Sequence, residues 1–220
     1  MALINTCIGC GSKSIDNLGT LGKLPNCNHF ELSQRVALDL PKYELDLVKC
    51  SDCELVQVGT HLPVIEVFSD NYPYFSSYSK SWLEHCKQAA KYYKENLNIG
   101  HGSSVLEIGS NDGYFLRYFS ECKVVLGVEP TKGPADAAKR DGIKTRLNFF
   151  NDDVAKEIIK EEGQFDLILS NNMLAHTPDL KSVLSGVRHA LKESGKFIVE
   201  VQYASDMFLD GKFDTVYHEH

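Results

Sequence analysis

Apolar residues follow two different patterns in the part of the chain after residue 100. Short apolar runs, typical of buried strands, alternate with longer stretches of helical spacing. The runs predict strands at residues 104–108, 124–129, 143–147, 165–170 and 196–202, and the stretches between them predict helices from about 113, at 134–141, at 153–161 and at 180–192. Strands that alternate with helices predict an α/β fold with a doubly wound parallel sheet, in which ligands bind at the carboxyl ends of the strands.

The first hundred residues show a different pattern. Alternation in VALDL, YELDLVKC and ELVQV, within residues 36–58, predicts short strands around Pro41. An amphipathic helix is predicted over 81–96, because Ser81 and Glu84 have the order of a capping box and an apolar series begins at Trp82. We therefore expect a small module at 1–66, a connecting segment and helix at 67–100, and the α/β domain at 101–220.

Composition and charge narrow the classes of function. The chain has 220 residues, of which 43% are hydrophobic and 24% charged, so it has a core to bury. Its net charge of -7 argues against binding nucleic acid mainly through the phosphates. The start has no basic segment followed by an apolar one, and no run of about 18 apolar residues occurs. We expect a soluble, cytoplasmic protein with no membrane or nucleic-acid partner.

Four of the seven cysteines form two C-x2-C pairs, Cys7 with Cys10 and Cys50 with Cys53. In a reducing compartment two such pairs are typical of a closed, tetrahedral zinc site, which is structural because four thiolates leave no open position. Substitution of one ligand by Cys27 or His29, and simple burial of the cysteines, are less favoured alternatives. Residues 1–65 hold five Lys plus Arg and seven Asp plus Glu, so this module is not a basic patch.

The first predicted strand of the α/β domain leads into a glycine loop. Glu107 is followed by Gly109 and Gly113, which allow a sharp turn, but the motif is not the G-x-G-x-x-G of dinucleotide binders. The second strand ends at Glu129, where a carboxylate can accept both hydroxyls of a ribose, and the fourth reaches the same edge at Asn171. This constellation is similar to that of an S-adenosylmethionine methyltransferase.

The segment FSDNYPYFSSYSKSW, residues 68–82, is rich in Tyr, Ser and Phe. Such a composition suits a recognition surface, because these side chains combine apolar area with hydrogen-bonding tips. Composition alone favours the plainer alternative, a linker whose rings pack between two domains. The choice between these two depends on the rest of the sequence.

Several motifs together resemble the sugar C-methyltransferases of deoxysugar biosynthesis. They are CIGC, LGKLPN, LDLVKCSDCELVQV, NYPYFSSYS, LEIGSNDGYFL, GVEPT, NNMLAH and FDTVYHEH, and they span essentially the whole chain. The resemblance implies a zinc-binding domain at 1–66, a Rossmann-like methyltransferase domain at 101–220, and a further C-terminal domain. It also implies methyl transfer from S-adenosylmethionine to a ring carbon, usually C3, of a nucleotide-linked 4-keto-deoxysugar.

The resemblance assigns roles to particular residues. His220 matches the general base, with Glu219 beside it and Tyr217 near the sugar; without the resemblance, a frayed polar terminus is an equal alternative. The connecting segment becomes a sugar or cofactor contact surface, which reverses the preference for a linker. Phe149 and Phe150 flank the adenine or pack in the core. The implied cofactor residues are Glu107, Gly109, Asn111, Gly113, Glu129, Asn171 and His176, and the implied substrate residues are Tyr72, Tyr74, Ser77 and Tyr78.

Two rival functions share the cofactor site. One is a zinc-ribbon methyltransferase acting on RNA or protein, which needs a basic face, and the other is a binding module without turnover. A methyltransferase of the type resembled has seven strands, whereas five are predicted before His220. We therefore expect an N-terminal portion of a longer enzyme, with weak or absent turnover by itself.

Overall fold

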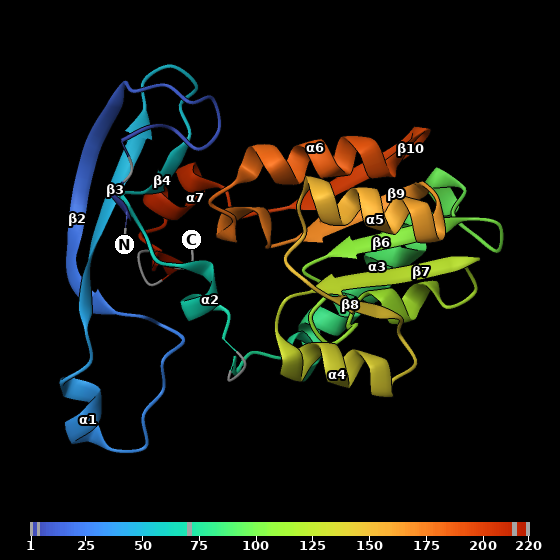
Figure 1. Ribbon diagram of the computed structural model, residues 1–220, viewed down its shortest axis with the longest axis horizontal. Helices are drawn as coiled ribbons and strands as arrows, with labels where there is room; N and C mark the ends of the chain where they lie inside the picture. Colours follow the sequence, from blue (N-terminus) through green and yellow to red (C-terminus); the bar gives the residue numbers. More distant parts are fainter. Residues whose placement is uncertain (1, 4, 70–71, 213–214, 219–220) are drawn as a thin grey trace. The chain divides into compact units, whose positions relative to one another are not determined.

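The computed structural model describes residues 2, 3, 5–69, 72–212 and 215–218, and the chain divides into two compact units (Figure 1). The first unit comprises residues 1–69, 175–181 and 201–220, and the second comprises 70–174 and 182–200. Each unit is described by itself. The predicted domain boundaries after residues 66 and 100 stay a prediction.

The second unit contains a five-stranded sheet in the order β10-β9-β6-β7-β8, and every neighbouring pair is parallel. The predicted parallel α/β fold is confirmed. From the central strand β6 the chain passes outward to β7 and β8, then returns to the other side of β6 through β9 and β10. The topological switch point therefore lies between β6 and β9, where open α/β sheets place their ligands. The strands are β6 (Ser104–Ile108), β7 (Val124–Glu129), β8 (Thr145–Leu147), β9 (Phe165–Asn171) and β10 (Leu191–Glu200).

Alternation along the buried strands divides their side chains between two cores. Leu106 and Ile108 of β6 pack in one core with α5 and α6, whereas Val105 packs in the other with α3. Figure 1 shows α5 and α6 in front of the sheet and α3 behind it. Glu107 follows the alternation and points to the α3 face, so a carboxylate enters an apolar core. The helices are α3 (Lys80–Leu97), α4 (Lys132–Arg140), α5 (Asp152–Glu162) and α6 (Leu180–Ala190).

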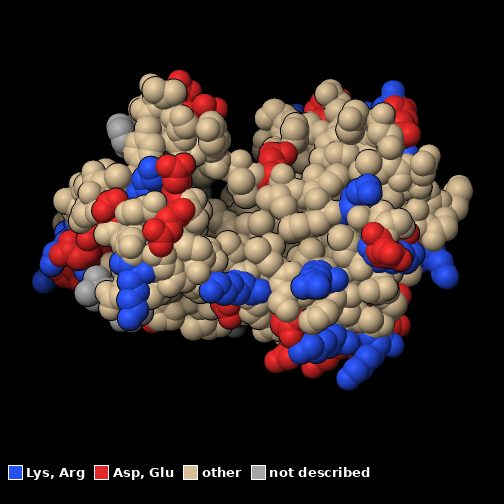
Figure 2. All heavy atoms as spheres, turned by 90° about the horizontal axis from the view of Figure 1, so that it is seen from above, with Lys and Arg blue, Asp and Glu red and all other residues tan. Residues whose placement is uncertain are grey.

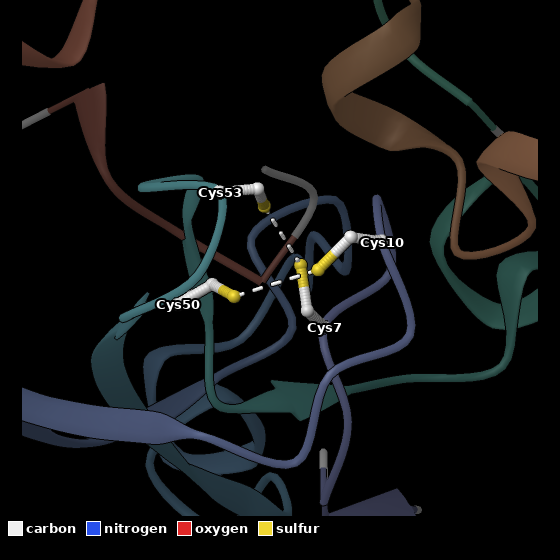
Figure 3. A group of neighbouring side chains, drawn as sticks. All are labelled: Cys7, Cys10, Cys50 and Cys53. Atoms are coloured by element: carbon white, nitrogen blue, oxygen red, sulfur yellow. Dashed lines mark hydrogen bonds between the residues drawn. The ribbon is translucent and has the colours of Figure 1, made fainter.

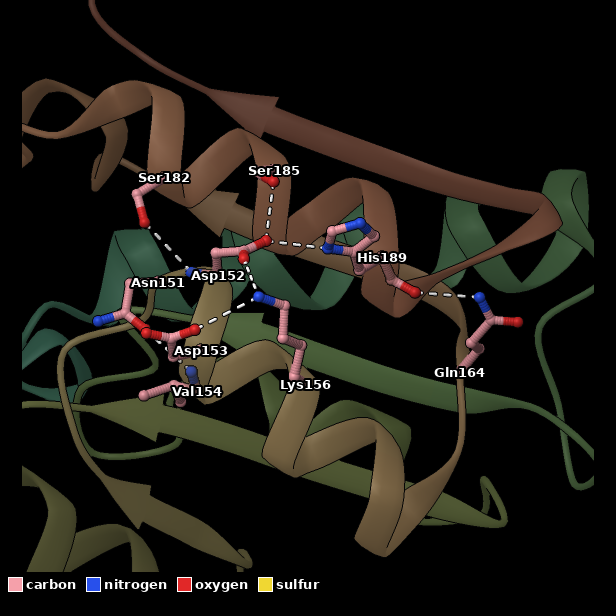
Figure 4. Close-up of polar contacts among 9 residues, drawn as sticks. All are labelled: Asn151, Asp152, Asp153, Val154, Lys156, Gln164, Ser182, Ser185 and His189. Atoms are coloured by element: carbon pink, nitrogen blue, oxygen red, sulfur yellow. Dashed lines mark hydrogen bonds and ion pairs between the residues drawn. The ribbon is translucent and has the colours of Figure 1, made fainter.

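A polar cluster fastens α5 to α6 (Figure 4). Asn151 caps α5 by accepting a hydrogen bond from the Val154 amide. Asp152 accepts hydrogen bonds from Ser185 Oγ at 2.7 Å and His189 Nδ1 at 2.9 Å, both on α6. Lys156, followed by Ser185, lowers the pKa of Asp152 to about 2. The carboxylate is therefore ionised at neutral pH and suited to hold the start of α5 against α6.

Two predictions about helix starts in this unit are wrong, although the helix predicted over 81–96 is confirmed as α3. No α-helix begins near Gly113; a 3₁₀ turn covers Leu116–Phe119, because Gly113 has a left-handed φ of 75° and the apolar side chains that follow it are buried. Helix α3 is capped by Ser79 and not by Ser81. The Ser79 hydroxyl accepts a hydrogen bond from the Trp82 amide at 3.3 Å, so the helix begins at Lys80.

The first unit is built around an antiparallel sheet of β2 (Ile15–Pro25), β3 (Lys42–Cys50) and β4 (Val56–Val58). The predicted strands in YELDLVKC and ELVQV are confirmed as β3 and β4. The strand predicted in VALDL is wrong, since its first three residues end the short helix α1 (Gln34–Leu38), which buries no side chain and has no strand beside it. The remaining elements are β1 (Ala2–Leu3), paired with β5 (Thr60–His61), and the helices α2 (Val64–Val67) and α7 (Ala204–Leu209).

The structure also addresses membrane insertion. Within the ranges that it describes, no helix is both long enough and apolar enough to cross a bilayer.

Candidate functional site

The four paired cysteines converge in the first unit (Figure 3). The Cys7 and Cys53 Sγ atoms lie 3.5 Å apart, those of Cys10 and Cys50 lie 3.6 Å apart, and all four fall within 4.8 Å of one another. A tetrahedral site with Zn–S bonds of about 2.3 Å places its sulfurs about 3.8 Å apart. The four thiols therefore fit a closed, structural zinc ion. Cys27 and His29 are not members of this cluster.

Both C-x2-C segments fold as the same knuckle. The amide of Gly11 donates to the Cys7 carbonyl at 2.9 Å, and the amide of Glu54 donates to the Cys50 carbonyl at the same distance. Gly11 and Glu54 both have a left-handed φ, of 83° and 62°. In the second knuckle a residue with a Cβ thus takes the conformation that favours glycine. Each backbone turn aims two sulfurs at one point.

In the second unit, the loop after β6 turns through three left-handed residues, Gly109, Asn111 and Gly113, with φ of 72°, 47° and 75°. A Cβ on Gly109 would lie 2.7 Å from Met173 Cγ, and one on Gly113 would lie 2.9 Å from Ile143 Cγ1. Sequence reasoning attributed these glycines to turning and to the approach of a ligand. The structure adds a packing reason, because side chains of the protein already fill the space.

Glu129 closes this loop from the end of β7. Its side chain is 4% exposed, and its Oε2 accepts a hydrogen bond from the Asn111 amide at 2.9 Å. Oε1 accepts from the Thr131 amide at 2.8 Å and from the Thr131 hydroxyl. A carboxylate has about four acceptor positions, so one remains for a further donor. Burial raises the pKa of Glu129 above its ordinary value.

Glu107 and Asn171 meet across the switch point between β6 and β9. Asn171 Nδ2 donates to Glu107 Oε1 at 3.5 Å, whereas the fully buried Glu107 Oε2 has no hydrogen-bond partner among the described residues. Burial raises the pKa of Glu107 well above its ordinary range, and the negative charges of Glu129 and Asp112 raise it further. Buried acceptors lacking a donor suit a ligand that brings one.

These acceptors fit the chemistry of S-adenosylmethionine. That cofactor carries an ammonium group, a sulfonium and two ribose hydroxyls, which are positive charges and donors. Within the described part of the chain, Glu107 Oε2 and Asp112 Oδ1 are buried and make no hydrogen bond of good geometry, although the Tyr114 hydroxyl lies close to Glu107 and lowers its pKa. A site with three buried carboxylates thus matches a cationic ligand better than a phosphate.

Sequence reasoning missed how Asn111 and Asp112 are used. The Asn111 side chain accepts a hydrogen bond from the Ser76 amide at 2.8 Å and donates to the Tyr74 carbonyl at 3.2 Å. Asp112 Oδ2 accepts from the Ser77 amide at 3.2 Å. The adjacent Asn and Asp between two glycines were a signal for side chains that bond to backbone, but sequence does not indicate which segment receives them.

The predicted substrate residues all lie in the second unit, in the segment that this loop holds. The rings of Tyr72 and Tyr74 meet edge to face at 6.5 Å, and Tyr78 stacks on Phe75 at 5.3 Å while remaining 79% exposed. Ser77 contributes its amide to Asp112. Phe150 packs in the core with α5 and α6.

Of the remaining predicted residues, His176 and Tyr217 belong to the first unit. His176 lies in a 3₁₀ turn at Leu174–His176, and its ring meets Phe68 edge to face at 5.7 Å. The structure therefore does not group it with the other predicted cofactor residues. Tyr217 is half-buried, and Glu219 and His220 lie outside the described residues. The roles of all four stay predictions.

His218 was not singled out from the sequence. It is 4% exposed, and its Nε2 donates to the Glu44 carbonyl at 3.0 Å, while its ring meets Tyr43 edge to face at 6.0 Å. Both partners lie on β3, the strand that ends at Cys50. His218 is thus attached to β3, the strand that carries Cys50 of the cysteine cluster.

Two family models match the chain. A family described as "Methyltransferase domain" matches residues 80–220, and one described as "Putative zinc binding domain" matches residues 7–68. The second match contains both C-x2-C pairs, and the first contains the glycine loop and all five strands of the parallel sheet. The two matches thus coincide with the two candidate sites.

Individual proteins resemble the chain to different extents. The C-methyltransferase NovU of Streptomyces niveus is 30% identical over 218 residues, which cover 99% of this chain and 52% of NovU. A ubiquinone biosynthesis O-methyltransferase of Vibrio campbellii is 26% identical over 107 residues, 47% of this chain and 46% of that protein. The plantazolicin methyltransferase BpumL, solved in complex with SAH, is 15% identical with a TM-score of 0.46, covering 60% of this chain and 50% of BpumL. The chain spans about half the length of the curated relatives it matches.

Proposed function

The chain belongs to the methyltransferase domain family, and from this premise we propose that it is an S-adenosylmethionine-dependent C-methyltransferase acting on a nucleotide-linked 4-keto-deoxysugar. The observation that carries the proposal is the pair of buried carboxylates, Glu107 and Glu129, on neighbouring strands at the switch-point edge of the sheet. The name of the relative that matches nearly the whole chain, C-methyltransferase NovU, supports transfer to carbon.

The cofactor residues divide by the part of the ligand that they serve. Glu129, at the end of β7, is assigned to one ribose hydroxyl, because three protein donors leave its carboxylate a single acceptor position. Glu107, with Asn171 beside it, is assigned to the methionine end: burial favours the protonated form of this carboxyl in the ligand-free chain, and a bound ammonium would favour the ionised form and donate to Oε2. When bound, the cofactor supplies an electrophilic methyl group on a sulfonium.

The reaction needs a base and a nucleophilic carbon. The 4-keto group acidifies the neighbouring C3–H bond, and a base removes that proton to leave an enolate. The enolate carbon would accept the methyl group that the cofactor, held by Glu107 and Glu129, would supply, with the electron pair of the C–S bond staying on sulfur. We assign the base to His220, because an imidazole with an ordinary pKa of about 6.5 can accept a proton near neutral pH. By the same resemblance, Glu219 assists the base and Tyr217 is assigned to the sugar. Tyr72, Tyr74, Ser77 and Tyr78 are assigned to the sugar side.

The distribution of charge disfavours an RNA substrate. On the face drawn in Figure 2, Lys and Arg side chains are interspersed with Asp and Glu, and the coloured residues there form no continuous basic surface. The net charge of -7 points the same way. We therefore propose a small nucleotide-sugar substrate, with no nucleic-acid partner, for an enzyme that works in the cytoplasm.

Labelled S-adenosylmethionine tests the proposed function. The chain, in excess over acceptor, is incubated with nucleotide 4-ketosugars or with total RNA. We expect label in the sugar, together with the mass of one added methylene. His220→Ala is expected to abolish transfer while cofactor binding persists, since His220 is not among the residues assigned to the cofactor. Label in RNA alone would support the rival methyltransferase. With the chain in excess over acceptor a single slow turnover suffices for detection, so no label in either acceptor would support a binding module.

A further inference from the structure

The aromatic segment 72–78 is held by the cofactor loop through its backbone. Three hydrogen bonds join the two: the Ser76 amide to Asn111 Oδ1 at 2.8 Å, Asn111 Nδ2 to the Tyr74 carbonyl at 3.2 Å, and the Ser77 amide to Asp112 Oδ2 at 3.2 Å. All three use loop side chains and segment backbone. The aromatic side chains of the segment take no part in these bonds, so the attachment fixes the segment without occupying them.

The attachment is buried. Ser76, Asn111 and Asp112 are 5%, 7% and 3% exposed, so the hydrogen bond between Ser76 and Asn111 is shielded from water, while the other two are partly buried. By contrast, Tyr74 and Tyr78 in the same segment are exposed. The segment thus has a fixed backbone and accessible rings, an arrangement that suits a surface on which an acceptor rests.

Asn111 also contacts Glu129, the carboxylate that is assigned to the ribose. The amide of Asn111 donates to Glu129 Oε2 at 2.9 Å, while its side chain bonds to Ser76 and Tyr74. Asn111 holds a left-handed φ of 47°, a conformation that Asn adopts more readily than most residues with a Cβ. Any ligand that engages Glu129 therefore acts on the residue that positions the segment.

We propose that Asn111 and Asp112 are positioning residues that couple the cofactor site to the aromatic segment, so that binding of cofactor at Glu129 rigidifies the segment that receives the acceptor. This inference rests on the proposed function, because it takes Glu129 as the ribose ligand. It assigns the Asn111 side chain to the segment and not to the cofactor. The acceptor then binds more tightly to the cofactor-loaded protein than to the free one, because the ordering has already taken place.

Amide exchange of Ser76 and Ser77, followed by NMR, tests the attachment in the ligand-free chain. Asn111→Ala is expected to speed exchange at Ser76 about tenfold, and Asp112→Ala is expected to speed exchange at Ser77 by a similar factor. Asp112→Asn keeps a carbonyl acceptor and leaves Ser77 slow, which separates loss of the bond from misfolding. Asn151→Ala, which removes a helix cap elsewhere in the unit, is the matched control and leaves both amides unchanged.

The coupling is tested with S-adenosylhomocysteine as the probe, with its affinity measured by calorimetry. In the wild type, saturation is expected to slow exchange at both amides several-fold, and in Asn111→Ala this slowing is lost. If the probe binds and neither amide responds, the coupling is wrong while the cofactor assignment stands. If the probe does not bind at all, the proposed function and the coupling both fail, and the exchange rates of the ligand-free variants still decide whether the loop holds the segment.

Discussion

The metal centre and the cofactor site differ in how their residues are brought together. The four thiols come from two segments of four residues, and each segment forms its own knuckle. In both, the carbonyl of the first cysteine accepts from the amide four positions later, and its amide donates to the carbonyl five positions later. The cofactor site draws instead on β6, β7, β9, the loop after β6 and the segment before α3. The first arrangement is specified by local spacing, and the second only by the assembled sheet.

This difference determines which kind of substitution each site tolerates. A closed metal site loses its ion when one ligand is removed, because the other three do not complete the tetrahedron. In the cofactor site, Glu129 shares its hydrogen bonds among two protein residues and the proposed ligand, so one substitution weakens several interactions in part. We therefore expect an all-or-none response in the first unit and graded responses in the second.

The largest effect is expected at the metal centre. Cys50→Ser should reduce bound zinc from about one equivalent to below about a tenth and unfold the first unit, because structural zinc contributes about 10 kcal/mol of apparent folding energy in small zinc domains. Total metal analysis after chelator-free purification, with circular dichroism, measures both. Cys27→Ser, a cysteine outside the cluster, is the control and should retain the ion. Full zinc in Cys50→Ser would show that the four thiols are not the ligand set.

At the cofactor site, Glu129→Ala should weaken binding of S-adenosylhomocysteine by about tenfold to a hundredfold, since hydrogen bonds to a charged group contribute about 1.5–3 kcal/mol. The same change also removes the acceptor of the Asn111 and Thr131 amides. Glu129→Gln keeps one carbonyl acceptor and should show a smaller loss. Calorimetry measures the affinities. Equal affinity in wild type and Glu129→Ala would remove the ribose assignment.

The pH dependence of stability gives a smaller effect. Burial raises the pKa of Glu107 in the folded chain, whereas an unfolded glutamate has a pKa of about 4.3. Above about pH 4 the folded state therefore holds the proton that the unfolded state releases, and the free energy of unfolding falls as pH rises. Glu107→Gln cannot titrate, so its melting temperature should rise relative to the wild type between pH 4 and neutral pH. A constant difference across this range would contradict a buried, proton-holding Glu107.

The smallest effect separates the observed helix cap from the predicted one. Ser79→Ala should cost about 1 kcal/mol of stability, because its hydroxyl accepts from the Trp82 amide at the start of α3. Ser81→Ala should change stability little, since Ser81 lies inside the helix. Thermal unfolding of the two variants compares them directly. A greater loss in Ser81→Ala would restore the capping box expected from the sequence.

The sequence predicts those features that depend on short-range pattern. The ends of β6 and β7, the parallel sheet and the cysteine cluster follow from short apolar runs that alternate with helical stretches and from C-x2-C spacing, which are local patterns. The strand β2 was missed because Gly19 and Gly22 interrupt its alternation, and its register shifts beside both. A sequence pattern is a poor guide where a strand is irregular.

Short-range patterns do not identify the hydrogen-bond partners of buried polar groups. Asn111 and Asp112 bond to residues 35 to 37 positions earlier in the chain, and Asn171 reaches Glu107 across 64 positions. Only the folded sheet makes these residues neighbours. The position of Glu107, Glu129 and Asn171 at one edge of the sheet was therefore predictable, whereas the placement of His176 in the other unit and the side-chain contacts of Asn111 and Asp112 were not.

The central claim is that the loop after β6, with Glu107 and Glu129, is a site for S-adenosylmethionine. Calorimetric titration of the wild-type chain with S-adenosylhomocysteine, repeated with S-adenosylmethionine as competitor, tests it most directly. The account predicts one site per chain for which the two ligands compete. No heat with either ligand at high micromolar concentration would contradict it.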